Sequence, residues 1–559
     1  RPYSKTLRRE GDWRMNMAYQ PSYVSESSGR FDKPLVENTL TFDEKFGKHA
    51  INVMVGNSYQ KETYNQISGE IQDILQTSSG KYYDVMDAGT SLPQAGGYRN
   101  VAVLLSYLGR LNYTYDDKYL LTATFRRDAS SRVKKENRWG NFPSISAAWR
   151  ISKERFFAPV KWVDDLKVRA SYGTLGSLNI GYWDYAPVIN TFLTATFGTE
   201  QLQQNAAIQT NLVNENLKWE SQTQLDFGFD ATAFNNRLTF SADYYISKTK
   251  DVLTAMPILM TTGNGAGNPV VNAASLENRG FEFSLGWREK RKDFSYYASL
   301  NFSTVKNKVT SLGYGRVDII SGQGRTAVGR PIGEFYLIKT DGIFQNDDEI
   351  QSYKNSVGKV IQPDAKPGDI KYIDFNDDGK ITDADRQVLG SPHSLFQAGI
   401  NMGFAWKNFD LKMNWFMDIG SDVFNATKQY MIGADAAGNG DSNYLKNFNY
   451  WTPERPTNIP RPIAGKITNR RDSDYWLENG SWVKLKTLSI GYTIPEKLLH
   501  KIHFNTCRVY VTCQNLLTIS SFSMQDPEYR KDNIWNKGYR GVAAYPNPFA
   551  INFGVQFQF

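Results

Sequence analysis

Residues 550–559, AINFGVQFQF, decide the fold class of this 559-residue chain. Apolar residues occupy every second position, and Asn, Gly or Gln stand between them. Because successive side chains of a β-strand point to opposite faces, this alternation predicts a strand with one apolar and one polar face. An exposed apolar edge strand promotes aggregation in water, whereas the apolar face of a transmembrane β-barrel contacts lipid. The stretch therefore predicts a C-terminal barrel strand.

The composition permits such a barrel. Aromatic residues make up 14% of the chain, and the mean hydropathy is −0.50. No run approaches the ~18 consecutive apolar residues of a transmembrane helix, so we expect residence in a membrane through strands. No Pro/Gly/Ser-rich linker divides the chain, which favours one large domain. The net charge of +8 comes without a basic cluster, so we expect no nucleic-acid partner.

The alternation repeats along the chain as strand pairs. For example, the strand expected at 225–231 turns at Asn235-Asn236 into the strand expected at 238–244. Aromatic residues lie near each turn on the apolar face, as an interfacial girdle requires. We expect about sixteen or seventeen strands, with short turns on the periplasmic side. Long connections, which outer-membrane barrels place on the extracellular side, are expected at 63–100, 177–216, 310–394 and 423–480.

One expected strand breaks its own period. Val483 and Leu485 share one face, whereas Leu488 and Ile490 fall on the other. An extra residue in one strand of a pair shifts the side chains that follow it to the opposite face. We therefore expect a β-bulge near Lys486-Thr487.

Several blocks of sequence carry a resemblance to a known family. They are RRDASSR at 126–132, RWGNFPSISAAWR at 138–150, LKWE at 217–220, NRGFE at 278–282, DGIFQ at 341–345, GDIKY at 368–372, NGSWVKLK at 479–486, QNL at 514–516 and DPE at 526–528. In this set and its order, the chain resembles the SusC-like branch of the TonB-dependent outer-membrane transporters. The terminal Phe559 is also similar to the signal read by outer-membrane assembly machinery.

The resemblance implies an all-β fold, a large antiparallel transmembrane β-barrel of about 22 strands in the outer membrane. Residues 1–559 are then its C-terminal portion, with the plug domain and the first strands not in this chain. It implies an importer of oligosaccharides, glycans or peptides. The implied partners are a SusD-like surface lipoprotein, outer-membrane lipid, and TonB through the absent N-terminal portion. A passive porin-like channel and a non-transporting surface adhesion or binding protein remain alternatives.

Residues 374–385, DFNDDGKITDAD, have the spacing of an EF-hand calcium loop, with Gly379 at the sharp turn. The expected Ca²⁺ ligands are Asp374, Asn376, Asp378, Lys380 through its backbone carbonyl, and Asp385. Asp385 is shorter than the Glu that usually closes such a loop, and no flanking helices are evident. A structural Ca²⁺ in an extracellular loop over 341–394 and a solvated loop without an ion both remain open.

Aromatic residues in the expected loops are candidates for stacking on sugar rings or on peptide side chains. They are Trp183, Tyr185, Trp451, Trp476, Trp535 and Tyr545. Packing against a lipoprotein or placement in the girdle are the alternatives. No nucleophile elbow or phosphate-binding loop is present, and the four histidines are scattered, so we expect neither catalytic residues nor an organic cofactor.

Overall fold

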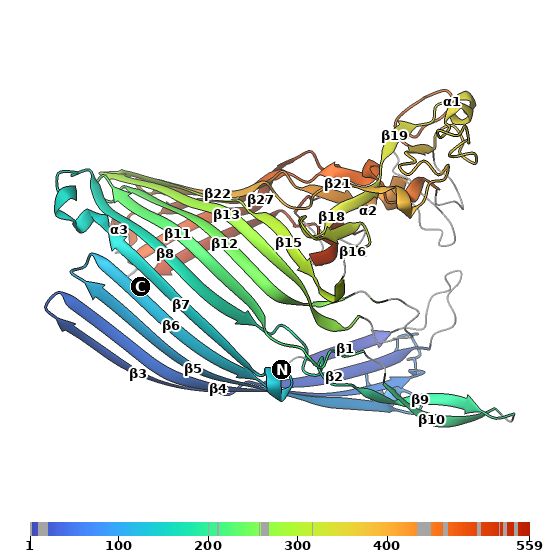
Figure 1. Ribbon diagram of the computed structural model, residues 1–559, viewed down its shortest axis with the longest axis horizontal. Helices are drawn as coiled ribbons and strands as arrows, with labels where there is room; N and C mark the ends of the chain where they lie inside the picture. Colours follow the sequence, from blue (N-terminus) through green and yellow to red (C-terminus); the bar gives the residue numbers. More distant parts are fainter. Residues whose placement is uncertain are drawn as a thin grey trace.

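One large antiparallel sheet dominates the structure, a computed structural model (Figure 1). The residues it describes are 3–8, 21–199, 201–209, 212–256, 258, 268–315, 317–432, 449–461, 468–499, 505–524, 526–528, 534–541 and 546–558. The 18 strands of the sheet are β1 (Tyr3–Arg8), β2 (Tyr23–Asp32), β3 (Leu35–Phe46), β4 (His49–Gln72), β5 (Gln94–Tyr115), β6 (Tyr119–Ser130), β7 (Trp139–Arg150), β8 (Val163–Ser177), β11 (Glu220–Ala233), β12 (Leu238–Ala255), β13 (Val270–Arg291), β14 (Phe294–Ser303), β15 (Lys306–Leu312), β22 (Phe396–Trp406), β23 (Phe409–Ile419), β26 (Trp482–Thr493), β27 (Thr506–Ser520) and β29 (Ala550–Gln558).

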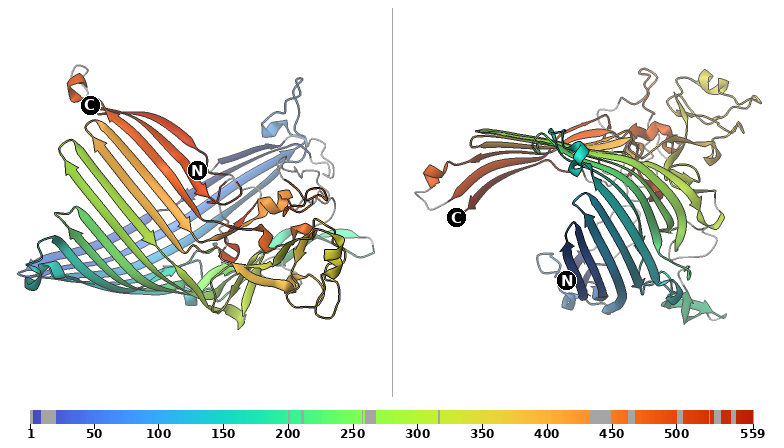
Figure 2. Two further views of the ribbon diagram at one scale, coloured as in Figure 1. Left: turned by 90° about the horizontal axis from the view of Figure 1, so that it is seen from above. Right: turned by 60° about the vertical axis from the view of Figure 1, so that its left-hand side comes forward.

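Neighbours in the sheet follow the chain, as expected for a meander of hairpins. β2 and β3 both pair with β4 and together make one crossing, and β14 and β15 both pair with β13 in the same way. The 18 strands of the described chain therefore make 16 crossings, within the range expected from sequence. β1 pairs with β2, β29 pairs with β27, and no pairing joins β1 to β29 among the described residues. The sheet curls into a trough (Figure 2).

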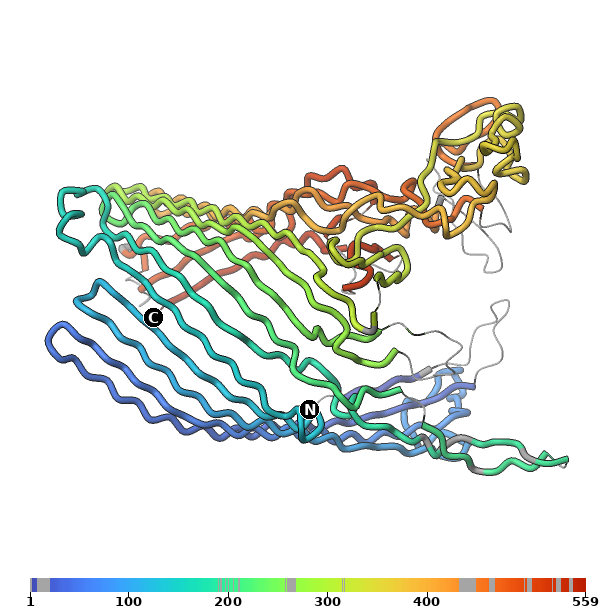
Figure 3. The backbone as a smooth tube through the Cα atoms, in the orientation of Figure 1, coloured from blue at the N-terminus to red at the C-terminus, as the bar shows by residue number. Residues whose placement is uncertain are grey.

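The two ends of the trough differ, as the tube view shows (Figure 3). Turns at one end are short and hold residues with positive φ, such as Asn235 (58°), Asn236 (57°) and Lys407 (53°). Tight hairpin turns require this left-handed backbone, and Asn is among the residues that adopt it readily. Aromatic rings pack across the strands beside these turns, with Tyr119 and Trp149 stacked at 6.5 Å between centroids. The short turns and the girdle are thus placed as expected.

The opposite end carries the remaining elements. They are β9 (Ile189–Phe197), β10 (Leu202–Gln209), β16 (Asp318–Ser321), β17 (Gly324–Ala327), β18 (Glu334–Ile338), β19 (Thr340–Ile343), α1 (Asp347–Ser352), β20 (Ile370–Tyr372), β21 (Arg386–Gly390), β24 (Asp422–Asn425), α2 (Ala426–Ile432), β25 (Leu477–Asn479) and β28 (Tyr539–Arg540). The short α3 (Glu496–Leu499) lies in a turn at the other end. No helix among the residues placed by the structure has the length and apolar character needed to span a membrane.

Two details bear on the expected strands. The bulge is confirmed: the pairing of β26 with both β23 and β27 skips Lys486, between Leu485 and Thr487. The connection expected over 63–100 is wrong, because β4 continues to Gln72 and β5 begins at Gln94. The parts of β4 and β5 that the sequence did not predict, residues 63–72 and 94–100, extend toward the long loops. They are rich in Gln, Ser and Gly and do not alternate apolar with polar residues. Phe559 lies outside the described residues.

The outward face of a central strand supplies a first prediction. Leu285 lies on the apolar face of β13, between Phe240 and Leu300, and is 38% exposed. Ser284 lies on the polar face beside it. We expect Leu285→Lys to destabilise the inserted protein by about 2–4 kcal/mol, because the ammonium enters the hydrocarbon layer. Urea unfolding in lipid vesicles measures this, and Ser284→Lys is the matched control. Equal destabilisation by both variants would contradict the assignment of the faces, and a larger effect of Ser284→Lys would reverse it.

Candidate functional site

The polar face of the sheet is joined by side-chain hydrogen bonds that run from strand to strand. Asn52 Nδ2 donates to Asp43 Oδ2 at 2.8 Å, Asn112 Nδ2 donates to Asn52 Oδ1 at 3.2 Å, and Thr122 Oγ1 donates to Asn112 Oδ1 at 3.0 Å. Further along the same face, Arg169 forms ion pairs with Asp226, Asp230 and Asp243 at 2.6–3.3 Å. This polar wall is the one expected to line a water-filled interior.

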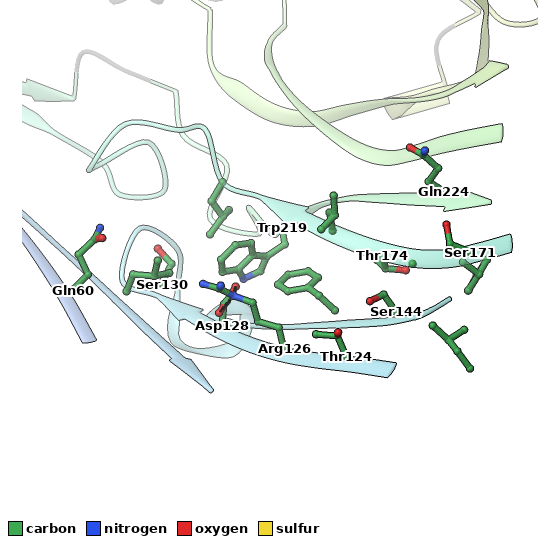
Figure 4. Close-up of a pocket in the computed structure, with 18 of the residues that line it drawn as sticks. Gln60, Thr124, Arg126, Asp128, Ser130, Ser144, Ser171, Thr174, Trp219 and Gln224 are labelled. Atoms are coloured by element: carbon green, nitrogen blue, oxygen red, sulfur yellow. Dashed lines mark hydrogen bonds and ion pairs between the residues drawn. The ribbon is translucent and has the colours of Figure 1, made fainter. Parts of the chain in front are cut away.

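A cavity of about 820 Å³, the wall pocket, lies on this face (Figure 4). Side chains from β4, β5, β6, β7, β8 and β11 line it, which places it inside the curve of the sheet. Figure 4 shows Arg126 and Asp128 beside the Trp219 ring. Phe142 meets Trp219 edge-on at 5.5 Å between ring centroids, and Trp219 Nε1 donates to the Arg138 carbonyl at 2.9 Å.

The charged groups of the wall pocket are paired with one another. Arg126 Nε donates to the Asp128 carboxylate at 2.8 and 2.9 Å. Arg132 Nη2 donates to Glu62 Oε2 at 2.6 Å. Sequence reasoning missed this pocket, although three of the blocks that carried the resemblance, 126–132, 138–150 and 217–220, contribute to it. The available signal was the row of Thr and Ser residues at one parity of neighbouring strands.

The extracellular head consists of residues 318–390, 421–432, 449–461 and 468–480. Its core is a cluster of buried side chains, Phe335, Leu337, Ile338, Ile370, Tyr372, Phe424, Ala426 and Trp476. Trp476 is fully buried, and its Nε1 donates to the Arg471 carbonyl at 3.1 Å. The extracellular loop expected over 341–394 is therefore part of a packed unit, with β19, α1, β20 and β21 inside it.

The structure places the candidate aromatic residues apart. Trp451, Trp476 and Trp535 are at most 7% exposed, so their rings pack in the interior and present no face to a ligand in this structure. Trp183 is 48% exposed and donates to Asn100 Oδ1 at 2.8 Å. Tyr185 is half-buried against the cluster of Val133, Ile180 and Leu217. Ligand contact by Trp183 and Tyr185 stays a prediction, and Tyr545 lies outside the described residues.

The EF-hand-like loop turns at Gly379, whose φ is +73°, as expected for its sixth position. Its carboxylates accept backbone hydrogen bonds: Asp374 Oδ2 from Gly379 at 2.7 Å, and Asp378 Oδ1 from Lys380 at 2.8 Å. Asn376 Oδ1 accepts from the backbone N–H of Asp378 at 3.1 Å. Asp385 is fully buried and accepts from the backbone N–H groups of Phe375 (3.0 Å) and Thr382 (2.7 Å). Within the described ranges, no group of three or more His, Cys, Asp or Glu side chains is arranged around a common metal position. Calcium binding here stays a prediction.

The calcium prediction is tested through the loop itself. If Ca²⁺ joins Asp374, Asn376 and Asp378, the ion holds together two carboxylates that otherwise repel one another. We then expect Ca²⁺ to protect the loop from protease cleavage, and Asp374→Ala with Asp378→Ala to abolish that protection. The fragment pattern with added Ca²⁺ or EGTA is the measurement, and Asp364→Ala, outside the motif, is the control. Equal cleavage of the unaltered protein with and without Ca²⁺ would leave a loop that holds no ion.

The last extracellular loop is fastened to the wall by the Lys484 cluster, defined as Lys484, Lys486, Asp526 and Glu528. The buried Lys484 Nζ donates to Asp526 Oδ1 at 2.6 Å and to Glu528 Oε2 at 2.8 Å, and Lys486 also pairs with Glu528. Burial acts to raise the pKa of Asp526, but hydrogen bonds from Lys484 and from backbone N–H groups outweigh it and hold the pKa below its usual range. The pKa of Glu528 is lowered by the two lysines against the same burial.

These lowered pKa values predict that acid releases the loop. A carboxylate whose folded-state pKa is depressed stabilises the fold above its unfolded pKa and loses this contribution as the pH falls through the folded pKa. We therefore expect residues 534–541 to lose hydrogen-exchange protection as the pH falls below about 4. Exchange rates corrected for the intrinsic pH dependence measure this. Protection that stays constant down to about pH 2 would contradict it.

Comparisons with known proteins agree with this architecture. A family model described as "TonB dependent receptor-like, beta-barrel" matches residues 3–516. The chain is 33% identical over 543 residues to TonB-dependent receptor P3 of Formosa agariphila, covering 94% of this chain and 52% of that protein. It is 28% identical over 487 residues to TonB-dependent receptor SusC of Bacteroides thetaiotaomicron, covering 84% and 45%.

The fold also resembles a solved structure, the RagAB peptide transporter. The TM-score is 0.80 at 22% identity, covering 96% of this chain and 56% of that chain. The chain thus spans about half the length of the curated relatives it matches. The matched family consists of outer-membrane β-barrel proteins that act in transport and are not generally enzymes. The chain belongs to the TonB dependent receptor-like β-barrel family and is an outer-membrane protein.

Proposed function

We propose that this chain forms the channel wall and the extracellular loops of a TonB-dependent importer. The observation that carries the proposal is the polar wall with its pocket, together with the packed head beyond the ends of the strands (Figure 1). A wall of this kind gives a hydrophilic ligand a path across the membrane, while the apolar face contacts lipid. The importer takes up oligosaccharides, glycans or peptides, and the chain itself carries no enzymatic activity.

The proposal includes two protein partners and a plug. Membership of the family and the relative named SusC support a SusD-like surface lipoprotein over the extracellular mouth. The head is the surface available to it, because it stands beyond the ends of the strands (Figure 1). Because the chain spans about half of its curated relatives, we assign the plug and the contact with TonB to sequence other than the residues described here.

The test starts from native outer membranes extracted in mild detergent. We expect a plug-bearing segment and a surface lipoprotein to copurify with this chain and to be identified by mass spectrometry. We also expect uptake of the ligand by cells to stop when TonB is depleted. Uptake that continues without TonB, together with steady conductance in planar bilayers, would favour the porin-like alternative. A protein that binds ligand at the surface but admits none would favour the adhesion alternative.

A further inference from the structure

Basic side chains gather on the outer side of the wall, at the long-loop end of β12, β13 and β15. These three strands lie side by side (Figure 1). Lys248 of β12 and Lys308 of β15 stand opposite Glu277 from its two sides, and Lys306 stands opposite Arg279. We define the outer basic patch as these five residues, Lys248, Glu277, Arg279, Lys306 and Lys308.

The outer basic patch shares the face of the sheet that contacts lipid. Side chains alternate between the two faces of a strand, and Glu277 and Arg279 have the same parity on β13 as the outward-facing Leu285. The opposite parity is turned inward, because Leu276 pairs with Val309 and packs against the buried cluster that contains it. The four basic side chains of the patch are exposed on the outer surface.

The height of the patch on the wall matches the headgroup layer of the outer leaflet. The outward-facing residues of β12 from Leu238 to Ile246 are apolar or aromatic, and a tilted barrel strand needs about this length to cross the hydrocarbon. Lys248 is the next outward-facing residue toward the long loops. On the same face of β13 and β14, the rings of Phe283 and Phe302 stack at 5.0 Å between centroids. The charges therefore begin where the apolar band ends.

The charges of the patch are not balanced within it. Glu277 forms ion pairs with Arg279 at 2.6 Å and with Lys248 at 3.6 Å. Lys306 and Lys308 form no ion pair with the part of the chain that the structure describes. Like charges that stand directly opposite each other destabilise a strand pair, and Arg279 stands opposite Lys306. Four cations that share one carboxylate thus require an anion from outside the chain.

We propose that the outer basic patch binds a phosphorylated lipid of the outer leaflet, of the lipid A class. Its phosphate lies among the four cations, because phosphate oxygens accept hydrogen bonds from several Lys and Arg side chains at once. Its acyl chains lie along the apolar band that contains Phe283 and Phe302. An anion at this place is carried by a lipid, since the patch borders the hydrocarbon layer directly. The lipid site goes beyond the proposed import and does not depend on it.

The experiment uses the native complex purified from outer membranes and freed of lipid by detergent exchange. Native mass spectrometry measures the binding of lipid A, of the same lipid A after phosphatase treatment, and of inorganic phosphate. Arg279→Gln with Lys308→Gln removes two charges of the patch. The matched control is Arg291→Gln with Lys292→Gln, which removes two charges at the short-turn end of β13. We expect lipid A to bind, the patch variant to weaken it at least about ten-fold, and the control to change it less than about two-fold.

A second variant covers the case in which the patch variant fails to assemble. Glu277→Gln removes the carboxylate that competes with the lipid phosphate for Arg279 and Lys248, so we expect lipid A to bind more tightly, by at least about two-fold. A misfolded protein would not gain affinity. Equal binding of dephosphorylated lipid A, binding of inorganic phosphate alone, equal weakening by the control, or unaltered or weaker binding in Glu277→Gln would each overturn the lipid site.

Discussion

Trp476→Ala is expected to unfold the extracellular head while the barrel wall stays intact. Trp476 is fully buried at the centre of the cluster that contains Phe335, Ile370 and Phe424. Removing a buried Trp side chain costs about 3–5 kcal/mol, because the cavity it leaves does not collapse completely. A small unit of this kind has a stability of the same order, so the head should populate open states. Limited proteolysis of intact cells should then cut 341–394.

The matched control for this prediction is Trp183→Ala. Trp183 is 48% exposed, and its removal costs one hydrogen bond to Asn100 and little packing. We expect the control to leave the cleavage pattern unchanged, and both proteins to keep the heat-modifiable migration of a folded barrel. Cleavage of the Trp476→Ala protein at the rate of the unaltered protein would show that the head is not held by its own core.

Lys484→Met is expected to release the last extracellular loop. The substitution leaves Asp526, which is 4% exposed, and Glu528 without their main cation. Breaking a buried ion pair by removing one partner costs about 3–5 kcal/mol, since the remaining charge is both desolvated and unpaired. Hydrogen exchange of 534–541 at neutral pH should rise accordingly, by at least about a hundred-fold.

Two further variants separate charge from packing. Lys486→Met removes the more exposed lysine, which pairs with Glu528, and should have a smaller effect. Combining Lys484→Met with Asp526→Asn removes both members of the closest pair and should restore part of the protection, because a neutral pair carries a smaller desolvation cost. An unchanged exchange rate in Lys484→Met would show that other contacts hold the loop.

Local periodicity was enough to predict the sheet but not the head. Alternation located the strands, the turn at Asn235-Asn236 and the bulge at Lys486, because each depends on residues close in sequence. The extensions of β4 and β5 were not predicted, since most of their residues are polar and only a few apolar ones, such as Ile67 and Ile71, stand among them. The loop tryptophans were expected at the surface because composition alone does not show that Trp451 and Trp476 have partners about 100 residues away, such as Gln345 for Trp451 (106 residues).

The wall pocket was not predicted from the sequence, for a related reason. Thr124, Ser144, Ser171 and Gln224 each look like ordinary lumen-facing residues on their own strand. Only the register between β6, β7, β8 and β11 brings them to one cavity. The register between neighbouring strands depends on residues far apart in the chain, so it cannot be predicted from the local pattern of a single sequence.

The contact between Trp535 and Ala255 also sets an order of events in folding. Trp535 Nε1 donates to the Ala255 carbonyl at 3.3 Å across 280 residues of chain, and Asn536 reaches Gln323 across 213. Contacts this distant in sequence carry a large loop-closure entropy until the intervening strands have paired. Trp535 therefore reaches its place late, after the hairpins between β13 and β27 have joined. The packing around Trp535 at the long-loop end is therefore completed last, after the strands of the sheet have paired.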